Sequence, residues 1–371
     1  MSLSTDSRRV TILKIAKRIR LTEPWHYKAP FLISIVYFFL AASGARFPDS
    51  FLAAGCALCT IAGIASTAYL SNDLADRDSD RRAGKPNCAL DLAPSRIAVL
   101  FAISGAAALL PWMIFVPVDR IWTTLLALEF LLFAAYLVRP IRLKERGWLG
   151  LTTDALYAHA NPALLAGYVM YRLTGQSYRH PAGLLGALTA WQFFVGLRGI
   201  LEHQISDAEN DRLGGTSTYV TQAGEAAATR LLRRFVVPLE LFSFGLYLSA
   251  VSWTLPALAI VFLAHVLVTA LLIHHYTSRF ASGSLHERLV LFLDDFSLGW
   301  MPLVILVDLA WNDWRNAVLL VVHFALFQSR LLPLFRYLQR AGRDLCLQVR
   351  LRRPADTLRD ESHSSGPESI S

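Results

Sequence analysis

The chain has 371 residues, of which 54% are hydrophobic and only 17% are charged. Soluble domains carry about 25% charged residues, so this composition excludes an ordinary soluble protein. The formal net charge is +8, but there is no basic, aromatic-interleaved soluble domain that would bind nucleic acid. Several apolar stretches approach about 20 residues, the length that crosses a hydrocarbon core. The sequence therefore predicts an all-α, polytopic membrane protein.

Residues 1–29 form a polar and basic segment that precedes the first apolar stretch. A cleavable signal sequence would place its apolar core much closer to the N-terminus, so no signal peptide is expected here. Residues 12–19 have partial helical periodicity, which is compatible with a helix on the membrane surface. We therefore interpret residues 1–29 as a basic N-terminal segment on the cytoplasmic side.

The apolar stretches then predict nine to ten transmembrane helices packed as a bundle. They lie at about 30–45, 51–71, 97–116, 121–138, 149–171, 183–201, 235–253, 255–274, 290–311 and 318–335. The last of them could lie along the surface instead. We expect one transmembrane domain at 30–311, an extra C-terminal helix with a basic segment at 312–353, and a disordered tail at 354–371.

Basic residues gather in alternate loops of this bundle. The dense clusters lie at 77–85, 139–146, 212–234 and 279–288, after the second, fourth, sixth and eighth helices. Cytoplasmic loops carry such an excess of lysine and arginine. The pattern predicts a multi-pass protein of the cell membrane whose N-terminus and these four loops are cytoplasmic.

An acidic cluster, NDLADRDSD at residues 72–80, ends the second apolar helix. Residues four apart share a helix face, so Asn72, Asp76 and Asp80 align over about 12 Å. Asp78 points nearly the opposite way, whereas the facing of Asp73 stays open. Stacked carboxylates repel each other unless a cation lies between them, and Mg²⁺ suits carboxylates combined with phosphate oxygens.

A second acidic cluster ends the sixth helix on the same predicted membrane side. Asp207 and Asp211 are again four residues apart, with His203 one turn before Asp207. A basic hairpin at 139–148 lies between the two clusters in the sequence. Facing carboxylates with Mg²⁺ suit a diphosphate, because the metal neutralises the charge of a departing group. His203 could orient Asp207, accept a proton or only form a hydrogen bond.

Three motifs carry a family resemblance. They are N-D-x-x-D-x-x-x-D at 72–80, D-x-x-x-D followed by G-x-x-T at 207–218, and the hairpin RPIRLKERGWLG at 139–150. Together they resemble the UbiA superfamily of intramembrane prenyltransferases. The resemblance implies a helical bundle around a central lipid-open cavity that is capped by the two acidic loops. It also implies Mg²⁺ as cofactor, a prenyl diphosphate as donor, and an aromatic or other lipophilic acceptor.

The resemblance carries over residue by residue. The expected metal ligands are Asn72, Asp76, Asp80, Asp207 and Asp211, the four aspartates also being the catalytic residues. The expected diphosphate contacts are Asn72, Lys85, Arg142, Lys144 and His203. The sequence departs from the family pattern at 85–87, where Lys-Pro-Asn replaces Arg-Pro and a small pair. It departs again at 209–210, where Glu-Asn replaces further aspartates.

Ionisable residues inside the predicted helices are functional candidates by default. Arg198 is expected to pair with Glu202, four residues later on the same helix. Asp154 could pair with the basic hairpin or bind the acceptor. His159 and Asn161 are expected to satisfy the backbone carbonyl that Pro162 frees at a kink.

Two other functions compete with acceptor prenylation. The same diphosphate site could ionise its substrate without an acceptor and yield a cyclised terpene. An ion-coupled transporter would also place carboxylates in the membrane, but transporters show inverted halves with broken midplane helices, and no such half-repeat is visible. Membrane lipid is an expected partner, whereas nucleic acid or an obligate protein partner is not.

Overall fold

The computed structural model describes residues 28–84, 87–115, 119–175, 178, 180–276 and 292–352, and these ranges contain helices and no strand. The chain divides into two compact units, Met1–Phe327 and Gln328–Ser371. The boundary falls inside the last helix at Phe327, whose φ of −114° and ψ of 21° depart from helical values. The described part of the second unit is the remainder of that helix.

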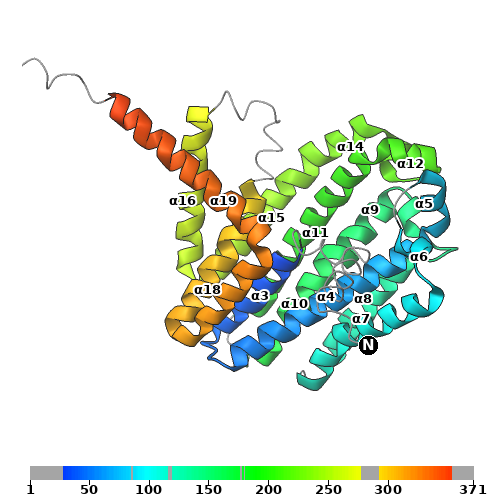
Figure 1. Ribbon diagram of the computed structural model, residues 1–371, viewed down its shortest axis with the longest axis horizontal. Helices are drawn as coiled ribbons and strands as arrows, with labels where there is room; N and C mark the ends of the chain where they lie inside the picture. The colour runs from blue at the N-terminus through cyan, green and yellow to red at the C-terminus, as the bar shows by residue number, and fades with distance from the viewer. Residues whose placement is uncertain are drawn as a thin grey trace, which may run out of the picture. The chain divides into compact units, whose positions relative to one another are not determined.

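The helices follow one another in the order expected from the apolar stretches (Figure 1). Their bounds are α3 (Ala29–Ala42), α4 (Asp49–Ala75), α5 (Arg77–Ala83), α6 (Cys88–Asp91), α7 (Pro94–Phe115), α8 (Arg120–Leu137), α9 (Trp148–Ala155), α10 (Asn161–Leu173), α11 (Pro181–Ser206), α12 (Ala208–Gly214), α13 (Tyr219–Ala223), α14 (Glu225–Leu231), α15 (Val237–Ser252), α16 (Pro256–Tyr276), α18 (Met301–Asn312) and α19 (Ala317–Arg352). Single 3₁₀ turns lie at Leu143–Glu145 and Trp314–Asn316.

Within the described residues, five helical stretches are long and apolar enough to cross a membrane. They are Asp49–Ala75, Pro94–Pro111, Arg120–Leu137, Pro181–Ser206 and Glu225–Ser252. Two shorter apolar helices, Ala29–Ala42 and Pro256–Ala270, accompany them. The all-α, multi-pass architecture is thus confirmed, while the count of nine to ten spans stays a prediction.

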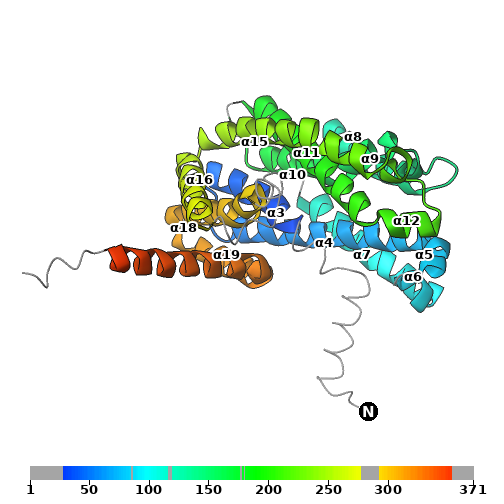
Figure 2. The same cartoon turned by 90° about the horizontal axis from the view of Figure 1, so that it is seen from above.

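Helix α3 is the centre of the first unit. A helix that is apolar all round must be buried on every side, and nearly all of α3 is buried. It packs against α4, α10 and α18 (Figures 1 and 2). The largest apolar cluster of the structure gathers around it, with Trp191 stacked on Tyr247 and Phe31 edge-on to Trp191.

Helices α4 and α7 lie side by side through a glycine contact. A Cβ atom at Gly63 would lie 2.3 Å from the backbone nitrogen of Ala108 and 2.6 Å from the carbonyl oxygen of Ser104. Only glycine permits so close an approach of two backbones. The contact fixes the distance between the helix that carries the first acidic cluster and its neighbour.

Three proline-containing helices are entered through one π-helical turn each. The π turns are Leu156–Ala160, Leu232–Val236 and Phe296–Trp300, and Pro162, Pro238 and Pro302 follow each turn by two residues. Proline lacks an N–H and its ring collides with the preceding carbonyl, so a widened turn accommodates it within an otherwise continuous helix. The break expected near Pro162 is therefore a π turn.

Candidate active site

The two acidic clusters are built on the same backbone design. Helix α4 bends into α5 at Asp76 (φ −101°, ψ 4°), and α11 bends into α12 at Asp207 (φ −96°, ψ 3°). Both short helices end at a glycine in the left-handed region, Gly84 with φ of 64° and Gly215 with φ of 70°. Glycine adopts this conformation without steric cost, which explains the residue at each end.

The helical hydrogen-bond pattern continues across both bends. Asp76 N–H donates to the Asn72 carbonyl over 2.9 Å, and Asp80 N–H donates to the Asp76 carbonyl over 2.9 Å. In the second cluster Asp211 N–H donates to the Asp207 carbonyl over 2.9 Å. The four-residue spacing of the carboxylates thus survives the bends. The expected single straight helix through each cluster is replaced by two segments.

The two short acidic helices meet. Helix α5 packs against α12, although their first residues, Arg77 and Ala208, are 131 positions apart in the chain (Figures 1 and 2). The structure therefore brings both acidic clusters to one end of the bundle, as the sequence predicted.

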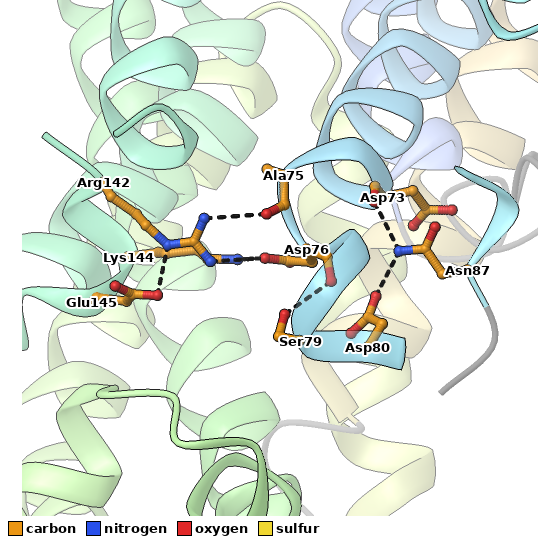
Figure 3. Close-up of polar contacts among 9 residues, drawn as sticks. All are labelled: Asp73, Ala75, Asp76, Ser79, Asp80, Asn87, Arg142, Lys144 and Glu145. Carbon is orange, nitrogen blue, oxygen red and sulfur yellow. Dashed lines mark hydrogen bonds and ion pairs between the residues drawn. The ribbon is translucent and has the colours of Figure 1, made fainter. Parts of the chain in front are cut away.

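The basic hairpin reaches Asp76 from the other side (Figure 3). Arg142 Nη2 donates to Asp76 Oδ1 over 3.0 Å, and Lys144 Nζ donates to the same oxygen. Arg142 also donates from Nη1 to the Ala75 carbonyl over 3.3 Å and from Nε to Glu145 over 2.6 Å. Two cations thus converge on one carboxylate where the first helix bends.

The side chains of Arg142 and Lys144 are both largely buried. Burial lowers the pKa of the Lys144 ammonium below its ordinary value, and the nearby Asp76 carboxylate offsets part of that effect. Arg142 is the one non-glycine residue with positive φ (35°) among the described residues. Such strained backbone clusters at functional sites, where the surrounding structure must hold it in place.

Asn87 is a site residue that motif reading missed. Its side-chain amide donates 2.8 Å hydrogen bonds to Asp80 Oδ2 and to the Asp73 carbonyl, and its Oδ1 caps α6 by accepting from Ala89 N–H (Figure 3). Asp73, whose facing the sequence left open, is buried and accepts from Cys88 N–H over 2.9 Å. The only sequence signal was the departure from the family pattern at 85–87. Lys85 itself lies outside the described residues.

The second cluster has a similar anchor but a different charge environment. Gln204 is buried and accepts from Val220 N–H over 3.4 Å, which ties α11 to α13. His203 Nε2 lies 3.9 Å from Asp207 Oδ2, with 68% of the histidine side chain exposed. Arg212 points elsewhere, to Glu209 and Glu225. Asp78, on α5, is exposed, in agreement with its predicted outward facing.

A cavity of about 270 Å³ extends from this end into the bundle. Asn72 lines it, as do α4 residues at helical spacing toward Ala57 and α8 residues from Phe133 to Trp122. The wall is mostly apolar, but Lys28 and Glu129 also line it. The cavity can hold an apolar chain or ring system close to the acidic clusters.

Arg198 forms a buried ion network beside the site. The expected partner Glu202 lies 3.6 Å away, but shorter contacts reach Glu240 on α15 at 2.8 Å and Asp294 at 2.9 Å. Asp154 accepts from the Tyr157 hydroxyl over 3.0 Å, and no ion pair joins it to the basic hairpin among the described residues. Its role in acceptor binding stays a prediction. Arg198, in contrast, joins α11 to α15.

The donor atoms of the two clusters fit Mg²⁺. Asn72, Asp76, Asp80, Asp207 and Asp211 offer oxygen atoms only, which is the chemistry that a hard divalent cation requires. In the part of the chain that is described, no three histidine, cysteine or acidic side chains form a ready-made metal cage. Mg²⁺ typically binds through one or two carboxylates together with substrate phosphates, so separated carboxylates suit it.

The fold and the site define a multi-pass helical membrane protein with paired acidic helix ends over an apolar cavity. Residues 31–293 match the model of the UbiA prenyltransferase family, and the chain belongs to this family. Comparison with curated proteins finds no match.

Two solved structures are similar to this chain. A UbiA homolog from Archaeoglobus fulgidus bound to DMAPP and Mg²⁺ is 17% identical, covers 79% of this chain and 99% of its own, and has a TM-score of 0.51. The structure of a UbiA homolog from the same organism bound to GPP and Mg²⁺ is also 17% identical, covers 84% and 99%, and has a TM-score of 0.48. At this identity the likeness concerns the fold alone.

Proposed function

We propose that this protein transfers a prenyl group from a prenyl diphosphate to a lipophilic acceptor, with Mg²⁺ as cofactor. One observation carries the proposal: two identically bent acidic helix ends meet beside a pair of buried cations, at the mouth of an apolar cavity. Family membership and the ligands of the Archaeoglobus fulgidus homolog support the same assignment.

The polar end would hold the diphosphate. Asn72, Asp76, Asp80, Asp207 and Asp211 would hold Mg²⁺, which supplies positive charge to the diphosphate oxygens. Arg142 and Lys144, now on Asp76, can turn toward an incoming diphosphate because they are already desolvated and adjacent. Preorganised charge of this kind stabilises a leaving group in the transition state.

The apolar cavity would hold the reacting carbon. The allylic C–O bond breaks with its electron pair on the diphosphate, and an electron-rich atom of the acceptor bonds to the resulting cation and loses a proton. The buried walls from α4 and α8 exclude water, which would otherwise capture the cation. The protein would act by positioning and electrostatics, with no nucleophile of its own.

We further propose that the acidic helix ends and the N-terminus face the cytoplasm. The hairpin 139–148 carries Arg139, Arg142, Lys144 and Arg146, and the segment after α12 carries Arg230, Arg233 and Arg234, all on the side of the acidic clusters. The positive-inside rule supports this orientation.

Mg²⁺-dependent release of diphosphate from a panel of prenyl diphosphates tests the function. Asp76→Asn and Asp207→Asn should each reduce release by at least about 100-fold, since each removes a charge on which the site depends. Asp78→Asn is the matched control, because Asp78 is exposed on the same short helix, and it should release diphosphate at the normal rate. Near-normal release by both Asp76→Asn and Asp207→Asn would refute the proposal.

The product distinguishes transfer from cyclisation. With a membrane-lipid extract present, mass spectrometry should find a prenylated component of that extract. A cyclised hydrocarbon formed without any acceptor would assign the terpene cyclase reaction to the same site.

A further inference from the structure

Glu129 is a buried carboxylate in the middle of an apolar helix. It lies on α8, is 7% exposed, and lines the central cavity together with Trp122, Leu126 and Phe133 of the same helix face. A carboxylate in such a place is costly unless it is paired or used. Neither the diphosphate site nor the packing of α8 requires an acid at this position.

One half of the Glu129 carboxylate is fixed by Asn161. The amide Nδ2 donates to Glu129 Oε2 over 2.7 Å and to the Leu125 carbonyl over 3.0 Å. Because both partners are acceptors, the amide can only present its nitrogen to them. The other carboxylate oxygen, Oε1, has no hydrogen-bond partner among the described residues, and Glu129 lines the cavity.

Lys28 also lines the cavity. It lies close enough for Glu129 and Asp154 to act on its pKa, which burial nevertheless lowers. No direct ion pair joins Lys28 to Glu129 within the described ranges. The ammonium and the carboxylate therefore face a shared space and do not neutralise each other by contact.

An apolar prenyl chain would bind unfavourably in the part of the cavity beside Glu129. It would strip water from Glu129 Oε1 and offer no hydrogen in return, which is unfavourable for a buried acceptor. Glu129 precedes the end of α8 at Leu137 by eight residues, or about 12 Å along the axis. A ring bound between the acidic clusters and Glu129 could present a polar group to Oε1 while its reacting atom faces the diphosphate end.

We propose that Glu129 determines acceptor specificity by accepting a hydrogen bond from a hydroxyl group of the acceptor at Oε1. The acceptor is thus a lipophilic molecule that carries a hydroxyl donor. The inference rests on the proposed function, because it assigns the cavity to the acceptor of that reaction. Asn161 acts as the positioning residue that keeps one carboxylate oxygen occupied and the other turned to the ligand.

Two probes of nearly equal shape test this proposal. 2-Naphthol carries a hydroxyl donor, whereas 2-methoxynaphthalene has the same rings and no donor. Each is dialysed to equilibrium against the full-length protein in lipid nanodiscs, and binding to empty nanodiscs is subtracted. The wild-type protein should bind 2-naphthol at least about tenfold more tightly, because the other probe leaves a buried acceptor unpaired.

Variants at Glu129 give a directional result. In Glu129→Gln the Asn161 amide holds the new side-chain oxygen, so the new NH₂ group faces the ligand, and the preference should vanish or reverse in favour of 2-methoxynaphthalene. If Glu129→Gln does not fold, Glu129→Met is measured in its place, and it should show no preference for 2-naphthol. Glu225→Gln is the matched control, since Glu225 is half-exposed on α14 and pairs with Arg212; its preference should equal the wild type.

Equal affinity of the wild type for both probes, no binding above empty nanodiscs, or a preference that persists in the folded Glu129 variants would overturn the inference. Mg²⁺-dependent diphosphate release is measured on the same wild-type preparation. Release without probe discrimination refutes only the role of Glu129, whereas absence of release refutes the proposed function.

Discussion

Replacing Asn87 by serine tests how the first acidic helix end is held. The Asn87 amide donates to the Asp80 carboxylate, and it also ties the loop to the Asp73 carbonyl. Serine is as good a helix cap as asparagine, so the bond to Ala89 N–H that begins α6 should be kept. The change therefore removes the two amide hydrogen bonds and leaves the cap in place.

The magnitude follows from the partners. A hydrogen bond to a charged group contributes about 1.5–3 kcal/mol, and one to a neutral carbonyl about 1 kcal/mol. The free energy of unfolding should fall by about 2.5–4 kcal/mol. If Asp80 is a metal ligand, Asn87 is the residue that orients it, and loss of such a residue weakens metal affinity by about 10- to 100-fold.

The assay is the Mg²⁺ concentration that gives half-maximal diphosphate release, measured with thermal unfolding in detergent. Asn210→Ala serves as control, because Asn210 is the exposed asparagine of the second acidic helix. It should leave both quantities unchanged. An Asn87→Ser protein with wild-type Mg²⁺ dependence would refute the idea that Asn87 positions a metal ligand.

Three further outcomes are expected from thermal unfolding of detergent-purified variants. Gly63→Val should lower stability strongly by pushing α4 from α7, whereas Gly55→Ala, where a Cβ meets nothing within 4 Å, should not. Arg198→Met should cost about 3–5 kcal/mol by leaving Glu240 buried without its partner, and adding Glu240→Gln should recover part of that loss. The Arg315 guanidinium lowers the pKa of Asp313 to about 2, so its stabilising effect is complete above about pH 4 and lost as pH falls toward 2. The difference in unfolding temperature between wild type and Asp313→Asn should shrink over that window, and a constant difference would contradict the assignment.

The helices could be predicted because membrane-spanning helices are recognisable in a sequence by their length and apolar composition. Each apolar stretch of the sequence has a corresponding helix, and the acidic clusters meet at one end of the bundle. The spacing of Asp76 and Asp80 was readable because a helix repeats nearly every four residues. These features depend on short stretches of sequence, so they could be identified from this sequence alone.

Contacts between distant segments were not predictable in the same way. Arg198 was expected to pair with Glu202 on its own helix, but its shorter contacts are to Glu240 and Asp294, 42 and 96 positions further along the chain. Helical spacing says which residues share a face and not which helix that face meets. The role of Asn87 was hidden for the same reason, because it depends on how the loop after α5 returns to α4.

The two acidic helix ends correspond position by position. Asn72, Asp73, Asp76, Asp80 and Gly84 correspond to the positions of a second set, which is His203, Gln204, Asp207, Asp211 and Gly215. In both sets the third position bends the helix and the last adopts positive φ. In both, the second position is buried and accepts a backbone N–H from a short helix further along the chain, α6 in the first set and α13 in the second.

The two helix ends therefore share a backbone but differ in charge. Asp76 pairs with the two buried cations Arg142 and Lys144, and Asp207 lies 3.9 Å from the largely exposed His203. Two matching carboxylate clusters suit metal ions on both sides of a diphosphate. Arg142 and Lys144 add further positive charge on the Asp76 side, where it can stabilise the leaving group. Arg142 and Lys144 come from the hairpin that directly follows α8, the helix that carries Glu129. One helix thus connects the diphosphate end of the cavity with the wall where we place the acceptor.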